Sequence, residues 1–309
     1  KTLYTLIIVM VAGLVYGQQL PQYSQYLFND YAYNPAVAGK NHYIDVKSNH
    51  RYQWVGITDS PRTYTLSAHG PSRNDKHGFG GYLFTDHVGP TRRSGFQASY
   101  AYHMTLAANN SGNPLKLSLA LSAGFLQWKL DGHKITMHDA GDQVIVDGVM
   151  TAIMPDAKFG LYLYQDQWFF GISAPQLIRS KVKFRNYGYF ATNLDAHYYV
   201  AGGYKFDLGD FDIEPSVLVK YASPAPVQVE GMARIIYKDN LWLGGAYRTN
   251  DAISAMIGYT YKNNIMLGFS YDFTYTNLRN YSTGVYEIML GVKFTKSKTF
   301  EDPEEKSSL

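Results

Sequence analysis

Histidine and aspartate side chains gather between residues 133 and 147, where they could do metal chemistry. His133, His138, Asp139, Asp142 and Asp147 offer nitrogen and oxygen atoms that could hold a divalent ion. Their spacing fits no calcium loop, because such a loop needs oxygen ligands at alternating positions and a closing glutamate. Solvated acids in a surface loop explain the group better. We therefore predict no metal site and no cofactor.

Signatures of catalysis are also missing from the sequence. The chain has no G-x-S-x-G elbow, no H-E-x-x-H motif, no phosphate-binding loop and no cysteine. The glycine run 78–81 (GFGG) lacks the spacing of a dinucleotide site. His50, His103 and His197 fall on predicted strands, mostly on polar faces, where neighbouring side chains can satisfy them. We predict no catalytic residue and no enzymatic activity.

Charged side chains on the polar faces of predicted strands allow two interpretations. The residues are Lys116, Glu230, Arg234, Glu287 and Lys293. They could line a water-filled pore, or they could brace one another in a plugged lumen. The residues themselves leave both alternatives open.

The elements that carry these side chains read as long β-strands with apolar residues at every second position. In 115–125, the odd-numbered residues are leucines, an alanine and a phenylalanine, and the even-numbered residues are lysine, serine, alanine and glycine. Successive side chains of a strand point to opposite faces, so one face is apolar and the other polar. Fourteen segments follow this alternation: Tyr43–Trp54, Arg62–His69, Gly78–Phe84, Thr91–Leu106, Leu115–Trp128, Ala157–Tyr164, Trp168–Ala174, Ala196–Asp207, Phe211–Tyr221, Val227–Tyr237, Leu241–Arg248, Ala252–Tyr261, Ile265–Phe273 and Val285–Thr295. Pro215 interrupts one of them, and we expect a local bulge there.

Charges are absent from the apolar faces of the clearest of these strands, as a lipid-facing barrel wall requires. An arginine or lysine at the bilayer midplane of such a wall costs roughly 2–4 kcal/mol. A soluble β-sandwich also alternates, but 28 tyrosines and 16 phenylalanines suit the aromatic girdles of a barrel. No segment after Gln18 approaches the roughly 20 apolar residues of a transmembrane helix. The predicted fold is all-β: a transmembrane antiparallel up-and-down barrel of about 14 strands.

Connection lengths support the barrel independently. One set of connections is mostly tight, as expected of periplasmic turns: 70–76, 107–114, 165–167, 208–210, 238–240 and 262–264. The other set includes the three longest connections, Lys129–Asp156, Pro175–Asp195 and Thr274–Gly284. This asymmetry predicts that both termini are periplasmic and that the long loops are extracellular.

Four regions follow from this pattern. Residues 1–17 have a positive start, a short apolar core and a small residue before the expected cut, as in a secretory signal peptide. Residues 18–42 form an N-terminal segment that lies in the periplasm or in the lumen. The barrel spans 43–295, and 296–309 form a charged periplasmic tail. The formal net charge of +3 is scattered and forms no basic stripe, so we predict no nucleic-acid partner.

Short motifs along the chain resemble those of one bacterial family. The segments 22–29 (QYSQYLFN) and 32–39 (AYNPAVAG), followed by 51–57 (RYQWVGI), resemble the opening of the PorP/SprF family. Further similarity falls in 60–63 (SPRT), Leu66-Ser67, Asp86 with Gly89, 99–103 (SYAYH), 241–244 (LWLG), Tyr247-Arg248, 271–273 (YDF) and Glu287-Ile288. One departure is Tyr286, where the family usually has histidine.

The resemblance implies an outer-membrane barrel of the type IX secretion and gliding machinery of Bacteroidota. Its members join the secretion apparatus, or partner a secreted surface adhesin and hold it at the cell surface. The expected contacts are outer-membrane lipid, type IX secretion components or an adhesin, and periplasmic peptidoglycan-associated or ring proteins. Candidate partner-docking residues lie in the opening motifs: Tyr23, Gln25, Tyr26, Phe28, Asn34, Pro35, Arg51, Gln53 and Trp54.

The leading hypothesis is therefore a non-enzymatic assembly partner or surface anchor for secreted proteins. Its extracellular loops would contact cargo, and residues 18–41 and 296–309 would face periplasmic components. The first alternative is a passive pore or a transporter of small hydrophobic solutes, which needs an open lumen. The second is a membrane-embedded hydrolase or acyltransferase, which needs a nucleophile paired with a histidine at the lipid wall.

Overall fold

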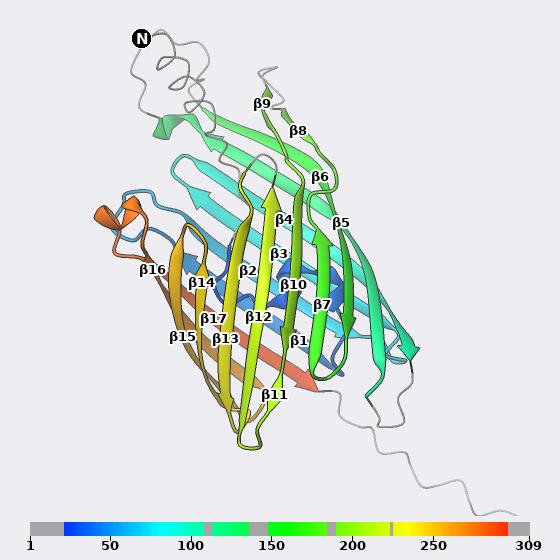
Figure 1. The fold of residues 1–309 in the computed structure, drawn as a ribbon. Helices are drawn as coiled ribbons and strands as arrows, with labels where there is room; N and C mark the ends of the chain where they lie inside the picture. The colour runs from blue at the N-terminus through cyan, green and yellow to red at the C-terminus, as the bar shows by residue number, and fades with distance from the viewer. Residues whose placement is uncertain (1–21, 108–112, 136–147, 184–189, 223–224, 296–309) are drawn as a thin grey trace, which may run out of the picture.

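The chain folds into a closed antiparallel β-barrel of fourteen wall strands, shown in Figure 1. This computed structural model describes residues 22–107, 113–135, 148–183, 190–222 and 225–295. The predicted all-β fold and its strand number are confirmed. None of the described helices is long and apolar enough to cross a membrane.

Each wall strand pairs with its neighbours in chain order, and β1 closes the barrel against β17 with Tyr43 opposite Thr295. The wall strands are β1 (Tyr43–Tyr52), β2 (Arg62–Pro71), β3 (His77–Val88), β4 (Thr91–Ala107), β5 (Leu115–Asp131), β6 (Val149–Tyr164), β7 (Trp168–Ala174), β10 (His197–Tyr204), β12 (Phe211–Ala222), β13 (Gln228–Tyr237), β14 (Leu241–Arg248), β15 (Ala252–Tyr261), β16 (Ile265–Thr274) and β17 (Val285–Thr295). The short strand β11 (Phe206–Asp207) continues the line of β10, and β8 (Lys181–Lys183) pairs with β9 (Phe190–Asn193).

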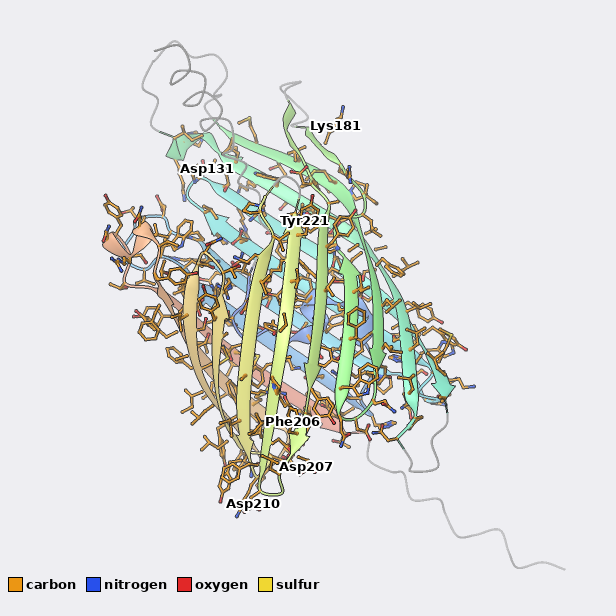
Figure 2. All side chains as sticks on the ribbon, in the orientation of Figure 1. Asp131, Lys181, Phe206, Asp207, Asp210 and Tyr221 are labelled. Atoms are coloured by element: carbon orange, nitrogen blue, oxygen red, sulfur yellow. The ribbon has the colours of Figure 1, made fainter. Side chains whose placement is uncertain are left out.

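Side chains alternate between lipid and lumen as the sequence pattern predicts. On β15 the exposed residues are Ile253, Ala255, Ile257, Tyr259 and Tyr261, and the intervening residues are buried. Large apolar side chains face outward across most of the wall, and Figure 2 shows side chains projecting from its outer surface. Burial in this barrel therefore means facing the lumen, and the exposed apolar surface is the surface that lipid would cover.

The two ends of the barrel differ in their connections. We call one the turn end: it carries the connections 72–76, 108–114, 165–167, 208–210, 238–240 and 262–264. We call the other the long-loop end: it includes the connections 53–61, 132–148, 175–196 and 275–284. Lys238, Asp239, Lys262 and Asn263 have positive φ angles of 48–59°, the conformation that such tight turns need.

Several strand boundaries differ from the sequence prediction, among them those of β1, β3, β5 and β6. β1 ends at Tyr52 rather than Trp54, because Trp54 has φ 53° and begins a turn. β5 and β6 extend into the segment predicted as the loop 129–156, and their pairing reaches Asp131 opposite Val149. Pro155 lies on a part of β6 that pairs with β5 and precedes the pairing with β7, which starts at Phe159. The missing N–H of a proline is tolerated at such a one-sided position.

The bulge expected at Pro215 is wrong. β12 pairs with β13 in one continuous register through Pro215, which lies opposite Ala233. On the other side the register is also unchanged, with Gly203 opposite Ser216 and Phe206 opposite Ile213. The proline interrupts only the hydrogen bonding between β12 and the strand beside it, and this interruption separates β10 from β11. The proline removes a hydrogen-bond donor without inserting a residue.

Candidate functional site: the luminal strap and the vestibule

Residues Gln22–Lys40, which we call the strap, run through the barrel lumen from one end to the other. At the long-loop end, Gln22 Nε2 donates to Gln228 Oε1 over 3.2 Å. The strap then passes along the inner wall, and Lys40 leaves at the turn end, three residues before β1 begins. Most of its side chains are buried, from Tyr23 through Ala38. The first part of the chain therefore fills the lumen.

The middle of the strap is shaped by two short helices, α2 (Asp30–Tyr33) and η1 (Pro35–Val37). Asn34 links them, because its Oδ1 accepts a hydrogen bond from the Ala36 N–H at 3.0 Å. Its Nδ2 donates to the Leu161 and Ile172 carbonyls of β6 and β7 at 2.9 and 3.3 Å. Pro35 at the first helical position has no N–H that would need a partner. The Asn-Pro pair thus turns the strap and ties it to the wall.

Glycines in the wall let the strap approach the strands closely. A Cβ atom on Gly78 would lie 1.8 Å from the Ala38 carbonyl oxygen, and one on Gly160 would lie 2.2 Å from Asn34 Oδ1. Such distances are far below van der Waals contact. These positions exclude any larger residue while the strap stays in place.

Aromatic side chains fill the space between the strap and the wall. The Tyr23 hydroxyl lies 2.8 Å from that of Tyr82, and the Phe28 ring stacks on Trp242 with centroids 3.9 Å apart. Tyr26 reaches Ser216 Oγ at 2.7 Å in the same way. Each buried tyrosine thus combines apolar contact with a satisfied hydroxyl group.

A buried charge network near the long-loop end holds the start of the strap. Ser24 Oγ donates to the Asp272 carboxylate at 2.7 Å, and the Ser24 N–H donates to Glu287 Oε2 at 2.9 Å. Arg51 joins the two acids, with its Nη2 2.8 Å from Asp272 and its Nη1 3.0 Å from Glu287. Arg51 Nη1 also donates to Ser24 Oγ at 2.8 Å. Each of these four residues is at most 2% exposed.

The same network extends across the lumen to β12, β13 and β14. Arg248 Nε lies 3.0 Å from Glu230 Oε2, and its Nη2 donates to Ser24 Oγ at 3.2 Å. Lys220 Nζ lies 3.3 Å from the same Glu230 oxygen. Three cations thus face three buried carboxylates, and Arg248 Nη1 also lies 2.9 Å from the partly exposed carboxylate of Asp251. Buried charges tolerate the loss of water only when they are paired and hydrogen-bonded in this way.

Seven of the nine residues singled out from the sequence meet in this luminal assembly. Tyr23, Gln25, Tyr26, Phe28, Asn34 and Pro35 are in the strap, and Arg51 is its anchor on β1. Gln53 and Trp54 instead lie in the connection 53–61 and are partly exposed. The docking role of these residues stays a prediction, and their contacts in this structure are with the barrel itself.

Sequence reasoning missed Ser24, Arg248 and Asp272 as members of the site. Arg248 and Asp272 fall on the luminal parity of their strands and inside two of the family motifs, so that signal was present. Ser24 lies inside the motif 22–29, but a serine in a polar segment gave no reason to single it out from its neighbours. Of the residues expected inside the lumen, Glu230 and Glu287 join the network.

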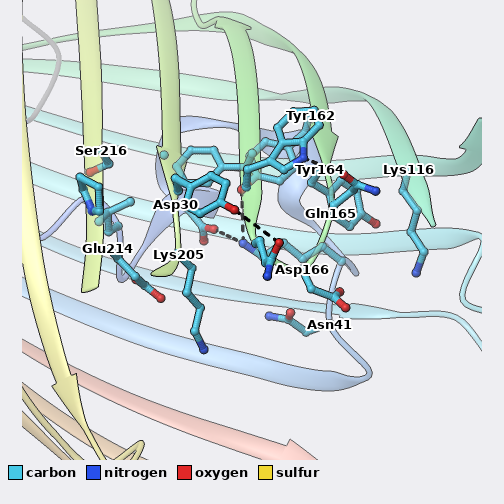
Figure 3. A pocket seen from close by; sticks show the side chains of 18 of the residues that line it. Asp30, Asn41, Lys116, Tyr162, Tyr164, Gln165, Asp166, Lys205, Glu214 and Ser216 are labelled. Atoms are coloured by element: carbon cyan, nitrogen blue, oxygen red, sulfur yellow. Dashed lines mark hydrogen bonds and ion pairs between the residues drawn. The ribbon is translucent and has the colours of Figure 1, made fainter. Parts of the chain in front are cut away.

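At the turn end the lumen opens into a cavity of about 650 Å³, which we call the vestibule (Figure 3). Strands β1, β5, β6, β7, β10, β12 and β13 and the strap contribute its walls. Among the lining residues are Leu27, Asp30, Lys40, Asn41, Tyr43, Lys116, Tyr162, Tyr164, Phe169, Lys205, Glu214, Ser216 and Arg234. Lys40 Nζ lies 2.5 Å from Asp30 Oδ2 where the strap borders the vestibule. Burial alone would raise the pKa of Asp30, but the positive charges of Lys40 and Lys47 lower it to about 2.

The described residues contain no cluster of three or more possible metal ligands. His133 lies in the described part, whereas His138, Asp139, Asp142 and Asp147 of the sequence-derived group lie outside it. His103 is held between the Ala38 carbonyl at 2.8 Å and the Tyr164 hydroxyl at 3.0 Å. It therefore positions the exit of the strap and has the environment of a structural histidine.

A closed barrel with an apolar outer surface and a polar, filled interior defines an outer-membrane β-barrel protein. Residues 15–292 match the family described as type IX secretion system membrane protein PorP/SprF. The chain belongs to this family, as its short motifs indicated, and it is an outer-membrane component of type IX secretion.

Solved structures share the barrel architecture but little sequence. The monoaromatic hydrocarbon channel CymD has 12% identity and a TM-score of 0.51, with 91% of this chain and 94% of that chain covered. The P. putida toluene transporter TodX has 9% identity and a TM-score of 0.45, with 84% and 90% covered. The outer-membrane protein Omp33 of Acinetobacter baumannii has 8% identity and a TM-score of 0.43, with 83% and 99% covered. The likeness to CymD is one of fold alone. No curated protein matches the chain by sequence.

Proposed function

We propose that this protein is a non-enzymatic type IX secretion component that acts as an assembly partner or surface anchor for secreted proteins. The observation that carries the proposal is the occupied lumen, together with membership of the family. The start of the strap is held at the long-loop end by a buried network of paired charges. A barrel whose interior is committed to its own chain works through the surfaces at its two ends.

The long-loop end is the surface we assign to the secreted partner, a surface adhesin or another exported protein. It carries the connections 53–61, 175–196 and 275–284, and exposed aromatic side chains such as Tyr281 and Tyr275 lie on it. The turn end and the vestibule would then face the periplasm, where peptidoglycan-associated or ring proteins of the machinery can reach them. Outer-membrane lipid covers the apolar wall between the two ends.

The strap changes one expectation about topology. Both termini were expected on the periplasmic side, but Gln22 lies beside Gln228 at the long-loop end and Thr295 lies at the turn end. Because the strap crosses the lumen, the two ends of the described chain are on opposite sides of the barrel. We therefore place only the C-terminal end of the barrel in the periplasm.

The test begins with gentle purification of the tagged protein from native outer membranes, followed by mass spectrometry of what accompanies it. We expect a large secreted protein, periplasmic components of the machinery, or both. Deletion of the gene should then remove that secreted protein from the cell surface, as measured by its sensitivity to protease added to intact cells. Unchanged display of every surface protein in the deletion strain would reject the anchoring role.

The alternative is a passive pore or a transporter of hydrophobic solutes. One observation favours it: the vestibule leads from the turn end into the lumen as far as Asp30 of the strap. Passage of a solute through the barrel would require the strap to move, because the strap fills the lumen between the vestibule and the long-loop end. Stable single-channel conductance of the purified wild-type protein would support this alternative against the anchoring role.

A further inference from the structure

The ion pairs of the vestibule leave part of its positive charge unmatched. Lys40 pairs with Asp30, Lys205 Nζ lies 2.7 Å from Asp212 Oδ2, and Arg234 pairs with Glu214. These carboxylates of the wall and the strap are therefore already engaged. A ligand that enters the vestibule would therefore encounter these side chains as neutral ion pairs.

Two lysines on the luminal parity of their strands have no carboxylate partner within ion-pair distance among the described residues. Lys116 on β5 lines the vestibule. Lys293 on β17 lies with its Nζ 5.2 Å from the centroid of the Tyr43 ring, which also lines it. The carboxylate of Asp166, exposed in the turn 165–167, offsets one of these charges at the rim. The wall thus offers a small positive excess next to the aromatic surfaces of Tyr43, Tyr164 and Phe169.

An acidic segment of the chain begins close to this cavity. β17 ends at Thr295, which pairs with Tyr43 at the turn end. Residues 296–309 lie outside the described part of the chain, and their sequence contains Phe300 followed by Glu301, Asp302, Pro303, Glu304 and Glu305. Five residues separate Thr295 from Glu301, and the six steps of the backbone between them can span up to about 20 Å. The acidic run can therefore reach the vestibule from its own strand end.

We propose that the vestibule is a binding site for an acidic polypeptide segment, and that its occupant is residues 300–305 of the same chain. The carboxylates of the segment pair with Lys116 and Lys293, and Phe300 packs on the aromatic wall. Any partner that uses the turn end then has to displace this segment. The inference does not depend on the proposed secretion role, because its test measures where the segment binds.

The natural chain has no cysteine, so pairs of introduced cysteines test the proposal directly. In the full-length protein in lipid nanodiscs, Q165C with T299C keeps all the charges of the site, and this pair should form a disulfide under mild oxidation severalfold faster than K262C with T299C. Lys262 is the matched control, because it lies in an exposed turn at the same barrel end, outside the vestibule. In 1 M salt the Debye length falls to about 3 Å, which screens the charges of the site. The rate of disulfide formation by the vestibule pair should then fall toward the rate of the Lys262 control pair. Equal rates at low salt would overturn the proposal.

A second measurement uses the segment in isolation. A barrel truncated after Thr295 should bind a fluorescent synthetic peptide of residues 296–309 saturably, as followed by fluorescence anisotropy. A peptide carrying Glu301→Gln, Asp302→Asn, Glu304→Gln and Glu305→Gln should bind at least tenfold more weakly. Lys116→Glu in the barrel should weaken binding of the acidic peptide by a similar factor. Equal affinity for the two peptides, or no binding of the acidic one, would contradict the assignment.

Discussion

Ser24 is the residue on which the luminal charge network converges. Its hydroxyl and N–H groups contact Asp272 and Glu287, and both Arg51 and Arg248 donate to its Oγ. A short polar side chain can occupy this point because it donates to an acid and accepts from two guanidinium groups. The arginines and the acids keep their charges only because each is paired within the lumen. The strap and the network therefore stabilise each other.

Removing one acid of the network should destabilise the folded barrel strongly. In Glu287→Gln, Arg51 loses a charged partner in a site without water access, and such losses cost about 3–5 kcal/mol. We expect a fall of this order in the free energy of unfolding, measured by urea titration in lipid vesicles. Lys205→Gln is the control, because the Lys205 side chain is 39% exposed and its pair with Asp212 is worth at most about 1 kcal/mol. Similar losses in the two variants would contradict the special role of the network.

Gly78 should tolerate no side chain while the strap is in place. A Cβ atom there would lie 1.8 Å from the Ala38 carbonyl oxygen, whereas Gly81 on the same strand has no heavy atom within 4 Å of such a position. Gly78→Ala should therefore loosen residues 34–40 and speed their amide hydrogen exchange by tenfold or more. Gly81→Ala should leave the exchange of that segment unchanged. If both variants exchange like the wild type, the strap does not pack on the wall as described.

At the scale of elements, the strap replaces the solvent that would otherwise fill the barrel. Strands bring polar side chains inward at every second position, and buried polar groups are stable when they are hydrogen-bonded. The strap provides partners for several of them with serine, asparagine and tyrosine side chains, as in the contact of Asn29 Nδ2 with Asn49 Oδ1 at 2.8 Å. The vestibule is the part of the lumen that the strap leaves open.

Deleting residues 22–40 should convert the barrel into a conducting pore. The deletion removes the side chains that fill the lumen on the side of the long-loop end. It leaves Arg51, Arg248 and the carboxylates of the charge network facing water. We expect clear single-channel steps in planar lipid bilayers for the deletion variant and little conductance for the wild type. A folded deletion variant with the conductance of the wild type would show that something other than the strap closes the lumen.

At the scale of the whole molecule, the barrel is asymmetric along its axis. Its long-loop end is closed by the charge network, and its turn end is open through the vestibule. The same asymmetry separates the ends of the described chain, with Gln22 at one end and Thr295 at the other. A protein built in this way can present different surfaces to the two sides of a membrane.

Single cysteines should report this orientation in intact cells. Ser282 lies in the connection 275–284 at the long-loop end, and Lys262 lies in a turn at the opposite end. A membrane-impermeant maleimide should label Ser282→Cys in intact cells and Lys262→Cys only after the outer membrane is permeabilised. The reverse pattern would invert the proposed orientation and place the vestibule outside the cell.

The sequence by itself determined the wall of this barrel. All fourteen strands, their outward faces and the identity of the tight turns follow from a period of two, because alternation is a local property that each strand shows on its own. One error occurred at a proline, because Pro215 suggested a bulge in a register that is continuous. The loop expected over 129–156 is also shorter than predicted, because β5 and β6 extend into it. A proline shows that a donor is missing but not which side of the strand needs it.

Only the tertiary structure decided what fills the lumen. Alternation places Arg51, Glu230, Arg248 and Glu287 inside, and that information fits a pore and a plug equally well. Ser24 meets Asp272 across 248 positions of the chain, and no local pattern encodes which inward residues face each other across a closed barrel. The path of the strap depends on close approach to Gly78 and Gly160, which is a property of the assembled wall. The barrel could be predicted because each strand carries its own signal, whereas the plug could not, because its contacts form only after the wall has closed.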